Sequence, residues 1–100
     1  MGSYIGDNTI IGRYALVHAC KIGDYSLIGM GSIILDQTII KNNAFIAAGA
    51  VVTPGTLIKT RELWAGNPAR FVRKISDVEE KLLKNTPEVY FKLSKEFLKK

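Results

Sequence analysis

The chain has 100 residues, 47% of them hydrophobic and 23% charged, which is the composition of one small globular domain. This composition excludes a disordered chain, and no apolar run is long enough to cross a membrane. The N-terminus lacks the basic and then apolar layout of a signal peptide. The single cysteine rules out an internal disulfide and a cysteine-type zinc site. We therefore expect a cytoplasmic protein without a membrane partner.

The net charge of +5 is unevenly distributed along the chain. Three basic and three acidic residues cancel within residues 1–58, whereas eleven basic and six acidic residues follow in residues 59–100. A neutral body with a mixed-charge tail is typical of a solvated helix face and not of a phosphate-binding surface. We therefore do not expect a nucleic acid partner.

The first 58 residues are a repeat with a period of six. The β-branched anchors of the repeat are Ile5, Ile11, Val17, Ile22, Ile28, Ile34, Ile40, Ile46, Val52 and Ile58. One five-residue step, between Val17 and Ile22, interrupts the period. Four places after an anchor the residue is small, at Thr9, Ala15, Ser26, Ser32, Thr38, Ala44, Ala50 and Thr56. Glycine often follows the anchor directly, at Gly6, Gly12, Gly23 and Gly29.

A period of six is not helical, and a sequence this rich in Ile, Val, Gly and Thr is a poor helix former. Short strands separated by tight turns fit it better, with inward anchors, small corner residues, and glycines that supply turn conformations closed to other residues. Three hexapeptides make one triangular coil of a parallel β-helix. Residues 1–58 are therefore predicted to form about three coils of an all-β solenoid.

After Ile58 the period stops. We expect an exit loop and a short extended segment over residues 59–75, with Leu63–Arg70 as loop and 71–75 extended. Ser76 and Glu79 form a capping box, so a C-terminal helix is predicted from Asp77 within residues 76–100. Pro87 interrupts this helix. The apolar stripe that follows needs a surface to cover, and the flank of the solenoid is the obvious one. The stripe residues are Val89, Tyr90, Leu93 and Phe97.

Three segments together resemble the γ-class carbonic anhydrase-like proteins of the hexapeptide-repeat superfamily. They are residues 22–32 with Leu27-Ile28-Gly29-Met30-Gly31, residues 63–70 with Trp64-Ala65-Gly66-Asn67-Pro68, and Tyr90-Phe91-Lys92-Leu93-Ser94-Lys95. The resemblance covers essentially the whole chain and implies coils of left-handed sense, an exception to the usual crossover preference. Members of this family are longer upstream, so the chain resembles their C-terminal portion only, as in a truncated protein.

The resemblance further implies a homotrimer with zinc or iron at the subunit interfaces, each metal held by three histidines, two from one subunit and one from its neighbour. Two of these histidines lie five residues apart, and the matching positions here are Arg13 and His18. His18 is the single remaining family ligand, whereas Arg13 is permanently charged and cannot coordinate a cation. We therefore expect a degenerate site, no bound cofactor and no CO2 hydration.

Several alternatives for these residues stay open. His18 is a structural or vestigial interface residue, a weak metal ligand or a general base, and Arg13 bonds Asp24 or Asp36 across an interface. As a general base, His18 would serve a hexapeptide acyltransferase that uses acetyl-CoA. A third reading is a non-catalytic trimeric assembly module, in which the open edge at residues 4–10 stacks trimers end to end.

Two further side chains are assigned structural roles. The thiol of Cys20 falls in the five-residue step and is predicted to be packed. Trp64 is expected to cover an open end of the solenoid or a subunit seam.

Overall fold

The computed structural model describes residues 3–83 of the chain. Ten strands of two residues each are followed by a hairpin, β11 (Glu62–Gly66) with β12 (Ala69–Lys74), and by one helix, α1 (Asp77–Leu83). The ten short strands are β1 (Tyr4–Ile5), β2 (Ile10–Ile11), β3 (Leu16–Val17), β4 (Lys21–Ile22), β5 (Leu27–Ile28), β6 (Ile33–Ile34), β7 (Ile39–Ile40), β8 (Phe45–Ile46), β9 (Val51–Val52) and β10 (Leu57–Ile58). The prediction of a left-handed parallel β-helix of about three coils with a C-terminal helix is confirmed.

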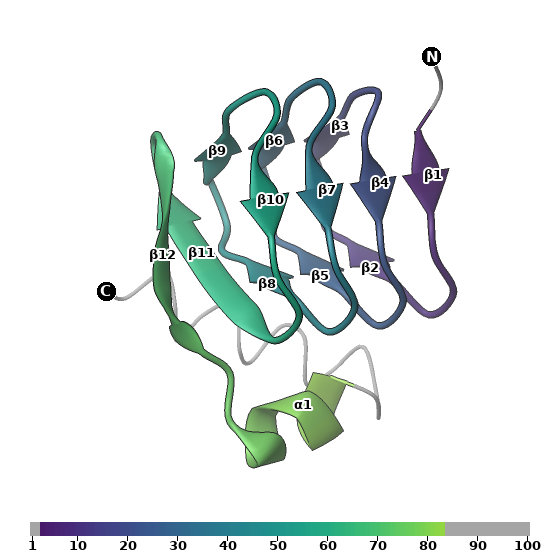
Figure 1. Cartoon of the computed structure of the whole chain (residues 1–100), viewed down its shortest axis with the longest axis vertical. Coiled ribbons are helices and arrows are strands. Elements are labelled where there is room, and N and C mark those ends of the chain that lie inside the picture. Colours follow the sequence, from purple (N-terminus) through teal and green to yellow (C-terminus); the bar gives the residue numbers. More distant parts are fainter. Residues whose placement is uncertain (1–2, 84–100) are drawn as a thin grey trace.

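Successive strands turn onto three different faces, and every third strand returns to the same face (Figure 1). Face A is the sheet β1-β4-β7-β10, face B is β12-β11-β8-β5-β2, and face C is β3-β6-β9. The short strands pair in parallel, so that Ile5 lies beside Ile22 and Ile22 beside Ile40. The anchors therefore form columns one coil apart, which is the geometry that the six-residue period predicts.

The turns between faces stack into three corners, and each corner is named by the faces it joins. The A/B corner holds residues 7–9, 24–26 and 42–44, the B/C corner 13–15, 30–32 and 48–50, and the C/A corner 18–20, 36–38 and 54–56. Within each corner the backbone of one coil hydrogen-bonds to the next, as Gly31 N–H does to the Arg13 carbonyl at 2.8 Å. These bonds keep the coils in register at the corners, where the strands end.

The interior of the prism is an aliphatic column. Its fully buried anchors are Ile22, Ile28, Ile34, Ile40, Ile46, Val52 and Ile58. The small residues at the corners complete the packing, because Ser26, Ser32 and Thr38 are buried and donate hydrogen bonds to backbone carbonyls. Each buried hydroxyl is therefore satisfied without a side-chain partner.

The first coil is packed differently from the others. Its anchors Ile5 and Ile11 are 44% and 37% exposed, whereas the equivalent Ile22 and Ile28 of the second coil are completely buried. The difference arises because β1, β2 and β3 each have a paired neighbour on one side only. End-to-end stacking over this coil stays a prediction.

The glycines act differently from the prediction. Gly6, Gly23 and Gly29 do not have positive φ; instead, a Cβ on Gly29 would lie 2.4 Å from the backbone nitrogen of Ala48 in the next coil. At Gly6, Gly23 and Gly29 the close approach of the next coil thus requires glycine after the anchor. Positive φ falls two residues later, as at Gly31 and Gly49. Non-glycine residues adopt it too, at Asn8, Tyr14, Ala19, Tyr25, Gln37, Asn43 and Arg61.

The segment expected as a loop is a hairpin. Leu63–Arg70 is largely extended, because β11 adds to face B in parallel with β8 and β12 then returns antiparallel to β11. Leu63 is buried beside Phe45, and partly buried Trp64 pairs with Ile46 and packs against the column of anchors. The expectation that Trp64 covers an end of the solenoid is confirmed. The sequence did not predict these strands because the six-residue period has ended before them and their alternation of apolar and polar residues is short.

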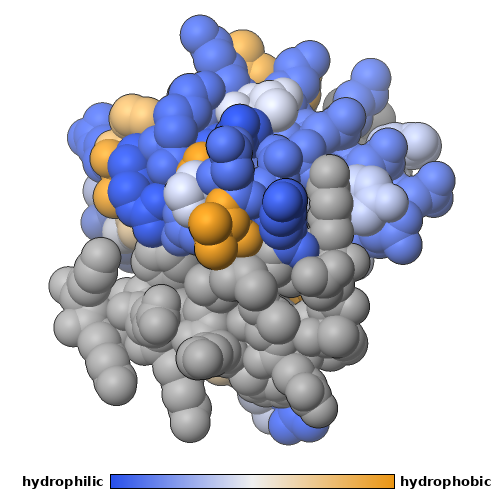
Figure 2. All heavy atoms as spheres, turned by 90° about the horizontal axis from the view of Figure 1, so that it is seen from below, coloured by the Kyte–Doolittle hydropathy of each residue, from blue (hydrophilic) through white to orange (hydrophobic). Residues whose placement is uncertain are grey.

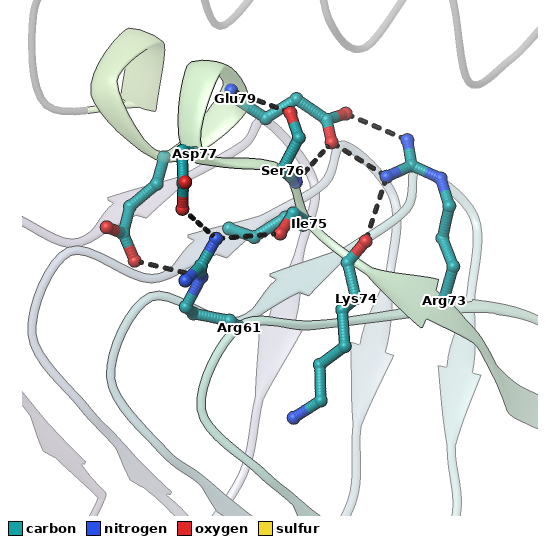
Figure 3. Close-up of polar contacts among 8 residues, drawn as sticks. Arg61, Arg73, Lys74, Ile75, Ser76, Asp77 and Glu79 are labelled. Atoms are coloured by element: carbon teal, nitrogen blue, oxygen red, sulfur yellow. Dashed lines mark hydrogen bonds and ion pairs between the residues drawn. The ribbon is translucent and has the colours of Figure 1, made fainter.

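Helix α1 begins at Asp77, as the capping box predicts. The Glu79 carboxylate accepts a hydrogen bond from Ser76 N–H at 2.8 Å, and the Ser76 hydroxyl accepts one from Glu79 N–H at 3.1 Å. Arg61 joins the helix to the last coil by contacts with Asp77 and Glu80 (Figure 3). The apolar stripe predicted over residues 89–97 lies outside the described residues. Within residues 3–83 no helix is long and apolar enough to cross a membrane.

The outer side of face B carries a second apolar cluster. It comprises Leu27, Phe45, Ala47, Leu63 and Ile75, all of them buried. Seen from this side and from α1, the described surface is mainly hydrophilic, with small separate hydrophobic areas (Figure 2). The outward-facing side chains of faces A and C are more exposed to solvent than this cluster, as Ile39 and Leu16 illustrate. Face C is flanked by Arg13 at one corner and His18 at the other.

Candidate functional site

His18 lies at the C/A corner, in the turn between β3 and β4. Its Nδ1 pairs with Oδ1 of Asp36, which occupies the same corner one coil further along the prism. The side chains of His18 and Asp36 are 64% and 55% exposed, so the pair stands on the surface. A carboxylate on Nδ1 orients the imidazole and leaves Nε2 as the nitrogen for a proton, a metal or a substrate.

The shortened step of the repeat builds this corner. Ala19, directly after His18, has a φ of 45°, and its carbonyl accepts a hydrogen bond from Gln37 N–H at 2.9 Å. The His18 N–H donates to the Ile34 carbonyl at 3.1 Å, which ties the turn to the coil that carries Asp36. Stacking of the two turns therefore places a side chain 18 residues away beside the imidazole.

Arg13 lies at a different corner from His18. It occupies the B/C corner at the other end of β3, and its exposed side chain makes no hydrogen bond or ion pair with residues 3–83. Asp24 lies at the A/B corner, where its carboxylate accepts the Asp7 N–H at 2.8 Å. Of the two acids proposed as partners of Arg13, Asp36 is therefore the one that lies with His18.

The described part of one chain does not by itself form the metal site that the resemblance implies between subunits. No three His, Cys, Asp or Glu side chains gather in residues 3–83 in a way that could hold a metal ion. One imidazole already paired with a carboxylate is all that the described part of one chain offers at the C/A corner. A stable catalytic zinc centre uses three protein ligands, and an arginine cannot replace one of them.

Three comparisons place the chain among known proteins. The family profile "Bacterial transferase hexapeptide (six repeats)" matches residues 19–54. A solved structure of a hexapeptide transferase family protein from Anaplasma phagocytophilum superposes with a TM-score of 0.77 at 31% sequence identity. That alignment covers 93% of this chain and 68% of the other. The chain belongs to the hexapeptide transferase family.

Two further relatives distinguish branches of this family. Gamma carbonic anhydrase 1, mitochondrial, of Arabidopsis thaliana is 41% identical over 90 residues, which are 90% of this chain and 33% of the relative. A maltose O-acetyltransferase from Clostridium difficile 630 superposes with a TM-score of 0.69 at 30% identity, over 75% of this chain and 49% of that chain. This hexapeptide-repeat protein is therefore γ-carbonic anhydrase-like in sequence. It spans about a third of the length of the curated relatives it matches.

A groove on face A, which sequence reasoning missed, lies next to the His18–Asp36 pair. Its volume is about 340 Å³. The residues that follow the pair in the chain, Ala19 and Gln37, contribute to its wall, with Tyr4, Lys21 and Ile39 from face A. Tyr4, Lys21 and Ile39 occupy one outward column of paired strands, and only the three-dimensional stacking reveals that they line a common surface.

The thiol of Cys20 also borders this groove but is buried. Burial raises the pKa of the thiol above its usual value, an effect that a hydrogen bond with Ser3 partly offsets. A thiol with a raised pKa is rarely the thiolate that acts as a nucleophile or metal ligand. The prediction of a packed thiol is confirmed by its burial.

Proposed function

We propose that this chain is a γ-carbonic anhydrase-like subunit that assembles as a homotrimer and does not hydrate CO2. The observation that carries the proposal is the pair of residues at the two ends of β3. Arg13 stands at one end, where the resemblance implies a histidine ligand, and at the other end His18 is held by Asp36. The family's metal and its trimeric assembly come to this chain only through the resemblance.

The chemistry of CO2 hydration explains why this replacement matters. The reaction needs a metal that converts its bound water to hydroxide near neutral pH. His18 is the only histidine in the chain, so a trimer contains three imidazoles, one for each of its three interfaces. If Arg13 of a neighbouring copy lay at that interface, its fixed positive charge would disfavour the binding of any incoming cation.

Metal content and CO2 hydration rates test this proposal together. Elemental mass spectrometry on chain purified without chelators should find less than about a tenth of an equivalent of zinc, iron or cobalt per chain. Stopped-flow assays should show no rate above the buffer blank. The Arg13→His variant is the matched test, because it restores an imidazole and should raise zinc binding. Close to one equivalent of metal and measurable hydration in the unaltered chain would overturn the proposal.

Acyl transfer is the second candidate, and the His18–Asp36 pair favours it. A carboxylate on Nδ1 holds the imidazole in the tautomer whose Nε2 can take a proton from an acceptor hydroxyl. The neighbouring groove on face A offers room for a substrate, and the similarity to a maltose O-acetyltransferase supports this class of reaction.

Calorimetry with acetyl-CoA separates the two candidates. Micromolar binding by the unaltered chain, with acetyl transfer abolished in His18→Asn and strongly reduced in Asp36→Asn, would favour the transferase. Absence of binding would favour the non-catalytic subunit.

Cytoplasmic location and the lack of a nucleic acid partner remain part of this proposal, supported by composition and charge.

A further inference from the structure

The strongest unexplained feature of the surface is that Arg13 and the His18–Asp36 pair lie at the two opposite edges of face C. Arg13 has no hydrogen bond or ion pair with residues 3–83, although arginine is the side chain best suited to bind carboxylates. The Asp36 carboxylate uses one oxygen toward His18 and is half exposed. A carboxylate can accept about four hydrogen bonds, so Asp36 retains the capacity to receive a guanidinium.

Arg13 and Asp36 cannot meet within one chain. Arg13 lies at the B/C corner and Asp36 at the C/A corner, so the strands of face C lie between them. A heterologous contact joins two different surfaces of the same protein. Here rotation of one copy relative to the next could bring Arg13 of the first onto Asp36 of the second. A ring of copies would use both surfaces on every subunit.

Face C has the surface expected of such a contact. Its outward column consists of Leu16, Ile33 and Val51, paired in register on β3, β6 and β9. In this column Leu16 is 52% exposed, whereas Ile33 and Val51 are half-buried. The outward column of face A exposes Tyr4, Ile39 and Leu57 but includes Lys21, so it is the absence of charge that distinguishes the column of face C. At the B/C corner Tyr14, next to Arg13, is 92% exposed. Exposed Leu16 and Tyr14, next to an arginine that has no partner among residues 3–83, have the composition of an interface core.

We propose that a second copy of this chain covers face C, with Arg13 of one copy bound to Asp36 of the next. The guanidinium then donates to the carboxylate that already orients His18, so each His18–Asp36 pair is completed by a residue from the neighbouring copy. This inference rests on the proposed homotrimer and specifies which face and which ion pair hold it together.

A charge-swap experiment tests this contact. Sedimentation velocity and native mass spectrometry measure the assembly of four proteins: the unaltered chain, Arg13→Asp, Asp36→Arg, and the double swap. Each single reversal places like charges together and should weaken assembly at least about tenfold. The double swap should restore it to within about threefold of the unaltered chain. Lys41→Asp, directly before the A/B corner, and Asp7→Arg, within it, make the same charge changes away from face C and should leave assembly unchanged.

Two failures are distinguishable. An unaltered chain that stays monomeric at tens of micromolar would overturn the homotrimer of the proposed function, and this contact with it. A trimer that withstands both single reversals, or that the double swap does not restore, would overturn only the Arg13–Asp36 contact. Circular dichroism of each variant establishes that its coils are folded, so that lost assembly is not lost structure. If the coils of every variant are folded, recovery of assembly in the double swap shows that the two residues contact each other. Two residues that each acted only within their own chain would not restore assembly in this way.

Discussion

The guanidinium of Arg73 on β12 donates two hydrogen bonds to the carboxylate of Glu79 on α1, at 2.7 and 2.8 Å (Figure 3). The same carboxylate accepts the Ser76 N–H of the capping box, so one side chain joins the hairpin to the start of the helix. The Arg73 hydrogen bonds lower the pKa of Glu79 from 4.5 to about 2; burial opposes this shift, and the Ser76 hydrogen bond adds to it.

A lowered pKa makes this contact dependent on pH. Because the folded pKa of Glu79 lies below the unfolded one, its contribution is fully present above about pH 4.5 and is lost as the pH falls toward 2. Glu79→Gln should lower the free energy of unfolding by about 1 kcal/mol at neutral pH, since Arg73 is partly exposed. Urea unfolding at neutral and acid pH should show the difference shrinking on acidification. Lys81→Gln, on the same helix, is the control; an undiminished difference at acid pH would contradict the assignment.

Two glycines allow separate tests of close approach and backbone conformation. Gly29→Ala places a methyl group against the backbone of Ala48 and should cost about 3 kcal/mol or more. Gly49→Ala meets no atom within 4 Å and carries only the penalty of its φ of 73°, about 1 kcal/mol. Thermal and urea unfolding measure both. Equal losses of stability in the two variants would contradict the assignment, because they would show that the short distance between Gly29 and the backbone of Ala48 adds no extra penalty.

Two phenylalanines test the cluster on the outer side of face B. Phe45 is buried in that cluster, whereas Phe71 on β12 is 49% exposed. Phe45→Ala should therefore lower the free energy of unfolding by about 3 to 4 kcal/mol, and Phe71→Ala by less than about 1 kcal/mol. Denaturant titrations of the two variants give the comparison. A small effect at Phe45 would mean that the cluster contributes little to the stability of the prism.

The buried thiol supplies a test of the first coil. Cys20 should react slowly with iodoacetamide in the folded chain and rapidly once urea unfolds it, because burial raises the pKa of the thiol and limits access. Mass spectrometry of the alkylated product follows both rates. Rapid reaction without denaturant would show that the C/A corner, which also carries His18, opens in the native protein.

Some of these features were visible in the chain alone and others were not. The capping box of Ser76 and Glu79 involves neighbours in sequence, so its pattern predicts the start of α1 directly. The hairpin was missed because β11 forms only by adding to β8, and Leu63 is buried only beside Phe45. The role of the glycines was misassigned for the same reason, since the backbone that excludes a side chain at Gly29 belongs to another coil.

The period of six by itself predicted the prism. Ten apolar anchors at this spacing can all point inward only if the chain turns onto a new face after each hexapeptide. Arg13 and His18 were singled out by the resemblance to the γ-class carbonic anhydrase-like proteins, at the positions that match two of that family's histidines. Only the tertiary structure decided that these two residues occupy different corners and that Asp36, which was expected as a partner of Arg13, pairs with His18. The physical reason is the length of a coil. Contacts between coils join residues about 18 apart, and the stacking of corners, which no local pattern encodes, selects which side chains meet.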